Sequence, residues 1–276
     1  MELKIFKDKK QTIRFLKENK EAIMKAKYAS LKNADAFSCH SLYWNEKEEV
    51  AEKQTSVSNW NDLKEIKVQA IINTTNIIDS HMDMHVPGIW EEDLKKNQRG
   101  MMHAQEHKGS EFKYIISDGE DLEVYTKTYS WSELGYRYEG DTQALVFDST
   151  VKRDRNGFMF EQYAKGYVKN HSVGMVYGEV ILAVNDSEDK YWADEYANYQ
   201  KYIGKAVNPE VAEEAGMFFI IPKAKAIEGS AVPQGSNFAT PTQSVVSVKE
   251  TTEKETQNRN LFNQRRKLFN RKHTTK

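Results

Sequence analysis

The sequence predicts an α+β fold built on a mostly antiparallel, barrel-like sheet with flanking helices. Two observations predict it: segments with strand patterns recur between residues 66 and 232, and helical segments intervene without a strict alternation of strand and helix. Strict alternation would indicate a parallel, doubly wound sheet, so that class is disfavoured. Hydrophobic residues make up 39% and aromatic residues 11% of the 276 residues, which is enough to build a substantial core.

The first strand is expected from residue 66 onward. Every second position from Ile66 to Ile72 is apolar, and a period of two places one side of a strand on a core. A turn is expected at Asp118-Gly119, because this dipeptide favours tight turns between strands. The further strand candidates are 112–117, 121–129, 143–149, 172–184, 217–221 and 223–232.

The N-terminal region carries an amphipathic pattern. From about residue 9 to residue 34, apolar residues recur at helical spacing among Lys and Glu, without Pro or Gly. We expect one long helix here, which either packs on the main domain or docks on a partner. Aromatic and apolar residues at a spacing of three to four predict further helices at about 158–166 and 188–214.

Composition divides the chain into four parts. We expect an N-terminal helical extension (1–43), a polar linker (44–62), one main domain (63–242) and a flexible basic tail (243–276). Residues 241–276 hold nine Lys and Arg against three Glu, in a segment too poor in apolar residues to offset the entropy of ordering. We interpret this segment as a solvated, disordered end, with contact to nucleic acid through its basic residues as the less favoured alternative.

Charge and cysteine content exclude several classes of protein. The formal net charge is -1, which gives no overall attraction to nucleic acid or to an anionic membrane. Cys39 is the only cysteine, so no disulfide forms within the chain, as is usual in a reducing cytoplasm. The first residues lack the apolar region of a signal peptide, and no stretch approaches a membrane span, so we expect neither export nor insertion.

Histidines and a serine are the candidates for chemistry. His103 and His107 belong to a cluster of four histidines between residues 81 and 107, and histidine serves both as a general base and as a metal ligand. Ser172 opens a predicted strand and is followed two positions later by Gly174, which permits close approach of the backbone. One hypothesis is therefore a serine nucleophile activated by histidine. The other is a metal site formed by His pairs at positions i and i+4, but neither 81–85 nor 103–107 matches an established zinc motif, so we expect no metal and no cofactor.

Four segments, taken in order, resemble the prohead serine proteases of tailed bacteriophages, distant relatives of the herpesvirus assemblins. Residues 79–90 (DSHMDMHVPGIW) resemble the early D-x-x-x-D-x-φ-x-P-G-A-F segment of that family, where φ is apolar. HAQEHK at 103–108 occupies the place of the catalytic histidine, and HSVGM at 171–175 matches the S-φ-G-φ nucleophile strand. Residues 227–232 (IEGSAV), followed by a small-residue turn, resemble the E-φ-S-φ-V strand, with Gly229 where the family prefers an apolar residue. The resemblance covers about 66–242.

The resemblance implies a catalytic site. Ser172 corresponds to the nucleophile, His107 to the general base and Glu228 to the third member. His103 is the alternative base and Glu106 the alternative acid. His107 is preferred because it ends the apolar-then-His pattern, and Glu228 because a residue adjacent to its own histidine seldom points at it. Gly174 is expected to shape the site near the oxyanion. Arg153 and Arg155 are expected in a solvated charged turn, and a contribution of positive charge to the site is the less favoured interpretation.

The resemblance also implies a biological role. It predicts a serine endopeptidase of capsid maturation that acts inside the procapsid, in the cytoplasm of the host bacterium. Its expected substrates are the scaffolding protein, the N-terminal region of the major capsid protein, and the protease itself, with self-association of the chain. The tail would serve as a self-cleavage linker and docking handle. The alternative from another class is a non-catalytic, scaffold-like assembly protein with a protease-related fold.

Overall fold

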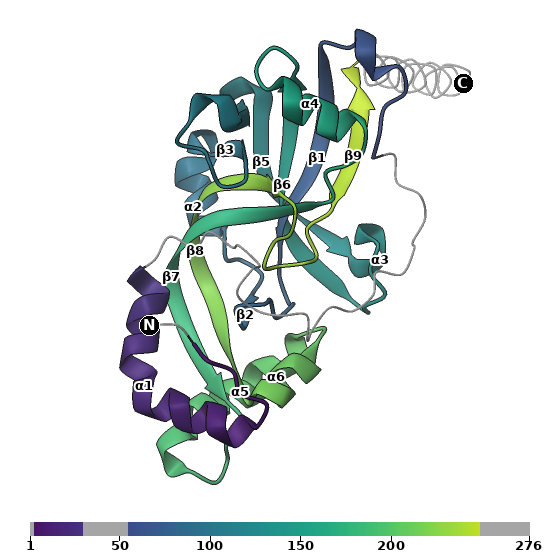
Figure 1. Cartoon of the computed structure of the whole chain (residues 1–276). Helices are drawn as coiled ribbons and strands as arrows, with labels where there is room; N and C mark the ends of the chain where they lie inside the picture. Colours follow the sequence, from purple (N-terminus) through teal and green to yellow (C-terminus); the bar gives the residue numbers. More distant parts are fainter. Residues whose placement is uncertain (1–2, 30–54, 249–276) are drawn as a thin grey trace, which may run out of the picture.

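A computed structural model describes residues 3–29 and 55–248, and within them the chain forms two sheets flanked by helices (Figure 1). The expected α+β class is confirmed. The strands are β1 (Glu65–Thr74), β2 (Asp83–His85), β3 (Met102–Gln105), β4 (Ile115–Asp118), β5 (Leu122–Ser130), β6 (Asp141–Lys152), β7 (Asn170–Val184), β8 (Met217–Val232) and β9 (Thr242–Ser247). The helices are α1 (Lys9–Ala29), α2 (Glu91–Asn97), α3 (Trp131–Leu134), α4 (Gly157–Ala164), α5 (Ala193–Tyr202) and α6 (Pro209–Ala215). Short 3-10 helices occupy Trp60–Asp62, Gln98–Gly100, Phe112–Tyr114, Gly119–Asp121, Lys190–Trp192 and Ile203–Lys205.

The first sheet has four antiparallel strands in the order β5-β6-β1-β9. The second has five, in which β8 pairs with β7 along one edge and with β2 and β3 along the other, while β4 lies outside β3. The β2–β8 and β3–β8 pairs are parallel, and the remaining pairs are antiparallel. Most strand pairs are antiparallel, but in place of one barrel-like sheet the strands of the described residues form two separate sheets that close no barrel.

The long strand β8 replaces the two strands expected at 217–221 and 223–232. Pro222 lies between them, and proline cannot donate a hydrogen bond to a neighbouring strand. In the structure β8 passes through this residue, at a point where the register to β7 shifts between the pairs Glu179–Lys223 and Ile181–Ile220. Because the pairing is already irregular at this point, the missing N–H donor of Pro222 does not end the strand. One continuous strand β8 therefore pairs with β2 near its start and with β3 near its end.

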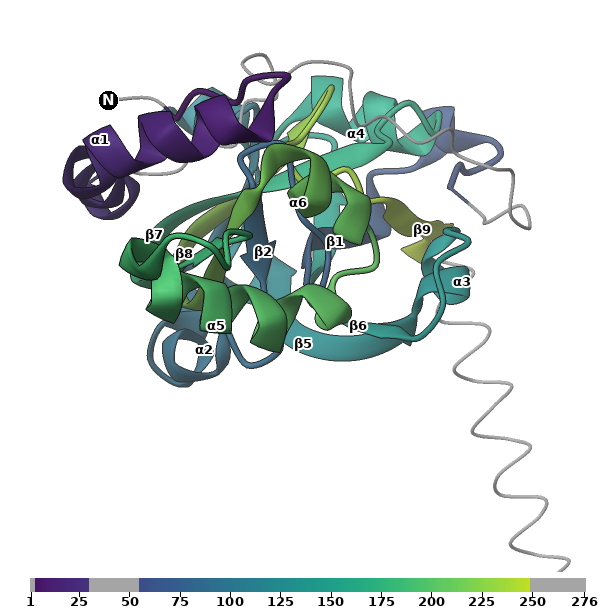
Figure 2. The same cartoon turned by 90° about the horizontal axis from the view of Figure 1, so that it is seen from below.

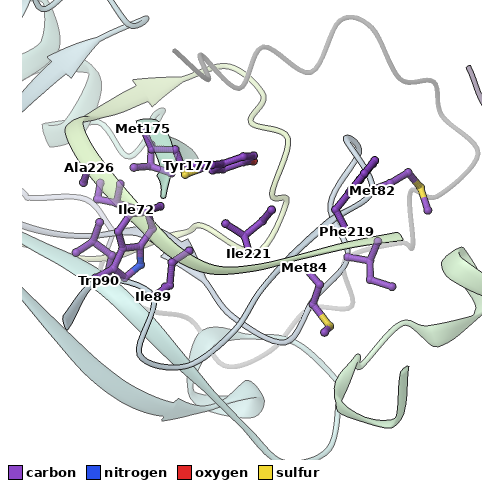
Figure 3. Close-up of a cluster of buried hydrophobic side chains, with 14 of the residues drawn as sticks. Ile72, Met82, Met84, Ile89, Trp90, Met175, Tyr177, Phe219, Ile221 and Ala226 are labelled. Carbon is purple, nitrogen blue, oxygen red and sulfur yellow. The ribbon is translucent and has the colours of Figure 1, made fainter. Parts of the chain in front are cut away.

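Apolar side chains from both sheets meet in one main core. Figure 3 shows part of it, where Ile72 of β1 lies near Trp90, and Met175 and Tyr177 of β7 lie near residues of β8. The helices α5 and α6 connect β7 to β8 and pack on these strands at the end where β7 stops and β8 begins (Figures 1 and 2). The other end of the β7–β8 pair holds Ser172 of β7, paired with Ser230 of β8.

Helix α1 is part of this folded unit. It ends at Ala29 in the described part of the chain, and the rest of the helix expected to residue 34 lies outside it. Its buried face, formed by Ile13, Leu16 and Ile23, joins the main core, and the helix runs beside β7 (Figure 1). Lys27 is buried near its end and forms an ion pair with Asp83. The interpretation of the amphipathic pattern as a helix packed on the main domain is therefore the one that the structure supports.

The segment boundaries differ from those expected. Residues 55–62 of the expected linker are packed: the Val57 side chain is buried, its backbone N–H donates to the Ala164 carbonyl at 2.9 Å, and Arg153 donates to the Trp60 carbonyl at 2.7 Å. At the other end, β9 extends past residue 242 and pairs with β1, so the tail expected from 243 begins with ordered strand. Residues 30–54 and 249–276, with most of the linker and tail, lie outside the described part.

No helix in the described ranges combines the length and the apolar character that crossing a membrane requires.

Candidate active site

The strands β3, β7 and β8 bring the predicted site residues together. Ser172 on β7 lies opposite Ser230 on β8, and Gly174 lies opposite Glu228. On the other edge of β8, Ala104 of β3 pairs with Ser230. Because side chains alternate along a strand, Ser172, Gly174, Glu228 and Ser230 share one face of the β7–β8 pair. His107 follows β3 by two residues and reaches this same face.

His107 and Glu228 form a short, buried hydrogen bond. The imidazole Nδ1 lies 2.6 Å from Glu228 Oε1, and the two side chains are 4% and 9% exposed. An ionised carboxylate only accepts hydrogen bonds, so Nδ1 carries the proton. In the neutral form of the ring, Nε2 then carries the lone pair that a general base requires.

The turn that carries His107 is strained. The Lys108 N–H donates to the Gln105 carbonyl at 3.0 Å, and Glu106 and His107 between them have φ of 51° and 58°. Tight turns of this kind favour Asn and Gly, and each other residue in this conformation costs roughly 1–2 kcal/mol. The Glu106 N–H holds the turn against β8 by donating to the Ala231 carbonyl at 3.0 Å. Such strain concentrates at functional sites, where it fixes a side chain in position.

Ser172 is the matching candidate nucleophile. It is 4% exposed, and its Oγ has no hydrogen-bond partner among residues 3–29 and 55–248. His107 Nε2 is likewise buried and without a partner in those ranges. A donor, the Ser172 hydroxyl, and an acceptor, His107 Nε2, are thus both buried without a partner in the described part of the chain. Serine and histidine are often not yet hydrogen-bonded in enzymes without substrate.

Gly174 makes room for the acid. A Cβ at this position would lie 2.4 Å from Glu228 Oε1, a distance that real side chains do not adopt. Gly174 therefore shapes the candidate site by leaving the space that the Glu228 carboxylate occupies. Gly229, the departure from the family pattern, has a packing reason: a Cβ there would lie 2.6 Å from Phe147 Cε2 in the core.

The segment from Pro233 to Pro241 lies against Ser172. A Cβ on Gly235 would be 3.5 Å from the Ser172 Cβ and 2.6 Å from the His171 carbonyl oxygen. Thr240 anchors the far end of this segment, since its carbonyl accepts from the His171 N–H at 3.0 Å and its hydroxyl donates to the His171 carbonyl at 2.6 Å. Ser172 is therefore buried beneath this segment.

His103, the alternative base, occupies a different environment. It is fully buried on β3, with Nδ1 2.8 Å from Ser149 Oγ and Nε2 2.9 Å from the Tyr163 hydroxyl. The same hydroxyl lies 2.9 Å from Nε2 of His171. Burial holds the pKa of His103 well below its usual value, and burial lowers the pKa of His171 to about 4. His103 has both nitrogens occupied and is a neutral core histidine, so it does not fit the role of base.

The metal hypothesis and the alternative acid also fail on geometry. Residues 103–107 form a strand and a turn, and His85 lies on β2, so neither His pair has the helical spacing that the metal hypothesis needed. Glu106 is 41% exposed and bonds Lys108 at 2.7 Å, away from the imidazole. Arg153 donates to backbone carbonyls at residues 60–63, and Arg155 pairs with Asp118 at 2.6 Å, so neither arginine serves the site.

One group of possible metal ligands does occur, at Asp79, His81 and Asp83, whose ligand atoms lie within 4.8 Å of one another. Its carboxylates already have partners. Asp79 Oδ1 accepts from the N–H groups of His81 and Asp83 at 2.8 and 2.9 Å, and Asp83 is bound by Lys27 and by the Tyr177 hydroxyl. Burial alone would raise the pKa of Asp83, but these two partners hold it below its usual value. The group therefore shapes the turn before β2 and anchors α1.

Ser230 is the site residue to which sequence reasoning assigned no role. Its Oγ bonds both Glu228 Oε2 and the backbone N–H of His107. The signal was present, since Ser230 follows Glu228 by two positions in a predicted strand and so shares its face.

Comparison with known proteins adds no family: no family model, no curated protein and no solved structure matches this chain.

Proposed function

We propose that this chain is a serine endopeptidase in which Ser172 is the nucleophile, His107 the general base and Glu228 the residue that orients the base. The observation that carries the proposal is the 2.6 Å bond from His107 Nδ1 to Glu228, which lies on the same strand face as Ser172. Within residues 3–29 and 55–248, neither His107 Nε2 nor the Ser172 hydroxyl has another partner. Serine needs an adjacent base to become a nucleophile, and His107, oriented by Glu228, is the histidine that we propose for this role.

The reaction follows from these positions. Ser172 Oγ attacks the carbonyl carbon of a peptide bond while its proton passes to His107 Nε2. The imidazolium that forms is stabilised by the Glu228 carboxylate, and it gives the proton to the leaving amine as the C–N bond breaks. The product of this half-reaction is an ester between Ser172 and the acyl part of the substrate, together with a free amine.

Water completes the cycle with the same groups. His107 Nε2 takes a proton from a water molecule, whose oxygen attacks the ester carbon. The proton returns to Ser172 Oγ as the ester bond breaks, which releases a carboxylic acid and restores the enzyme. Hydrolysis consumes one water for each peptide bond, and no redox partner is required.

The resemblance to prohead proteases supports a more specific role. We infer that the substrates are the scaffolding protein, the N-terminal region of the major capsid protein and the protease itself, cut inside the procapsid within the host bacterium. The support is the ordered set of segments 79–90, 103–108, 171–175 and 227–232, three of which contribute a residue to the candidate site.

Covalent labelling tests the chemistry without knowledge of the substrate. Diisopropyl fluorophosphate is small, and an activated serine displaces its fluoride to form a stable phosphoryl ester. We expect one adduct by intact mass spectrometry, located on Ser172 by peptide mapping and absent from Ser172→Ala and His107→Gln. Ser80→Ala is the matched control, because the Ser80 hydroxyl is also buried without a partner in the described residues but is not part of the site. An adduct that persists in Ser172→Ala contradicts the proposal.

A non-catalytic assembly protein remains the second candidate, and one observation favours it: Ser172 is covered by the segment 233–241 and its Oγ is buried. This candidate predicts no labelling of Ser172 at any reagent concentration that leaves the fold intact. The same experiment therefore separates the two functions.

A further inference from the structure

Ser230 lies at the centre of the candidate site without being one of its three expected members. It is fully buried on β8, opposite Ser172 on β7 and opposite Ala104 on β3. Glu228 precedes it by two positions, so the two side chains share one face of the strand.

The hydroxyl of Ser230 makes two hydrogen bonds whose directions are fixed. Glu228 Oε2 only accepts, so the Ser230 hydroxyl donates its proton to this oxygen. The backbone N–H of His107 only donates, so Ser230 Oγ accepts from it at 3.1 Å. The hydroxyl proton is therefore committed to the carboxylate, and Ser230 has none to give to an imidazole. This separates its role from that of Ser172.

These two bonds connect the acid to the backbone of the base. Glu228 uses one oxygen for His107 Nδ1 at 2.6 Å and the other for Ser230. His107 has φ of 58°, a conformation that needs support from its surroundings, and its N–H is held by Ser230. Without the hydroxyl, a buried carboxylate oxygen and a part-buried N–H in a strained turn both lose their partner, which is costlier than losing an exposed bond.

We propose that Ser230 is a positioning residue of the site: its hydroxyl holds the Glu228 carboxylate and the His107 turn in the relative placement that keeps Nε2 of His107 on the Ser172 face. Its effect on labelling rests on the proposed serine chemistry. Its effect on the geometry of the His107–Glu228 pair does not.

The test compares Ser230→Ala with Ser230→Thr, which keeps the hydroxyl on a β-branched side chain suited to a strand. The first readout is the rate constant for labelling of Ser172 by diisopropyl fluorophosphate. Loss of a hydrogen bond to a charged group predicts a fall of about 10- to 100-fold for alanine. We expect threonine to recover most of the rate. Ser149→Ala is the matched control, since Ser149 is a buried serine bonded to a histidine outside the site, at 2.8 Å from His103 Nδ1.

The second readout is the downfield proton resonance of the His107 Nδ1–H, assigned by its loss in His107→Gln. We expect this resonance to shift or broaden in Ser230→Ala, to persist in Ser230→Thr and to be unchanged in Ser149→Ala. If the alanine variant does not fold, Ser230→Cys takes its place, because a thiol is only a weak donor.

The outcomes separate the two proposals. Wild-type labelling rate together with an unchanged His107 resonance in Ser230→Ala overturns the positioning role. If the wild-type chain is not labelled at Ser172, the serine chemistry fails, and the resonance alone then decides whether Ser230 holds the His107–Glu228 pair.

Discussion

The substitution Gly174→Ala perturbs the candidate site without changing any of its three main members. The added Cβ would lie 2.4 Å from Glu228 Oε1, whereas ordinary contact begins at 3.4 Å, so the carboxylate must move by about 1 Å. Glu228 Oε1 is the atom that bonds His107 Nδ1 at 2.6 Å, so the move breaks or lengthens this bond. A displacement of about 1 Å in a catalytic group can cost about 100-fold in rate, and we expect a loss of that order in labelling by diisopropyl fluorophosphate.

Gly178→Ala is the matched control on the same strand. A Cβ there would meet Lys223 atoms at 3.4 Å, which is ordinary contact, and nothing in the site is near it. We expect this variant to label at the wild-type rate. Both variants are checked by thermal unfolding, so that a loss of rate is compared only between folded proteins. A folded Gly174→Ala protein that labels as fast as Gly178→Ala would refute the placement of Glu228 beside His107.

Three further outcomes are expected. Glu106→Gly should relieve the strain of the left-handed backbone at this position and raise the free energy of unfolding by about 1 kcal/mol in denaturant titrations. The labelling rate of Ser172 should not change. A labelling rate as low as that of Glu228→Gln would mean that Glu106 orients the base. Burial lowers the pKa of His171 from 6.5 to about 4, so the neutral ring contributes about 3 kcal/mol to the free energy of unfolding. This contribution is complete above pH 6.5 and is lost as the pH falls toward 4. Unfolding free energies that do not decline over this window would contradict the burial of His171. Lys27→Met removes the ion-pair partner of the buried Asp83 carboxylate and should lower the free energy of unfolding by about 3–5 kcal/mol. The double variant Lys27→Met/Asp83→Asn should recover part of this loss. A loss below 1 kcal/mol in thermal or denaturant unfolding would show that this ion pair does not anchor α1.

Much of the fold was predictable from local patterns. The alternation from Ile66 and the apolar run from residue 172 mark β1 and β7, because a half-buried strand or a fully buried strand leaves those signatures. The amphipathic pattern from residue 9 marks α1 for the same kind of reason. These elements are long enough for the pattern of apolar residues along each of them to be recognised.

The missed elements are short or depend on distant partners. Strands β2 and β3 have few residues and no clear alternation, and they exist because each adds to an edge of β8. Strand β9 has a polar composition, and its pairing with β1 is a long-range contact that no local pattern encodes. Whether the strands form one barrel-like sheet is likewise decided by long-range pairing, and those of the described residues form two sheets instead.

The candidate site, too, was predictable only in part. The order of the motifs predicted Ser172, His107 and Glu228, and the structure brings the latter two into a hydrogen bond. The choice between His103 and His107 depended on which of them faces the core, which the sequence of residues 103–108 leaves open. The structure decides it through the contacts of His103 with Ser149 and Tyr163. The covering of Ser172 by residues 233–241 had no sequence signal, because it depends on where that loop returns to β7.

Cleavage of peptide bonds tests the central claim most directly. The purified chain and its Ser172→Ala variant are incubated with a complex mixture of peptides from a bacterial digest, and new termini are identified by mass spectrometry. We predict new termini at a restricted set of sequences with the wild-type chain and none with Ser172→Ala, whose thermal unfolding should match the wild type. The same new termini produced by Ser172→Ala, or none produced by either protein, would contradict the claim that Ser172 is the nucleophile of an endopeptidase.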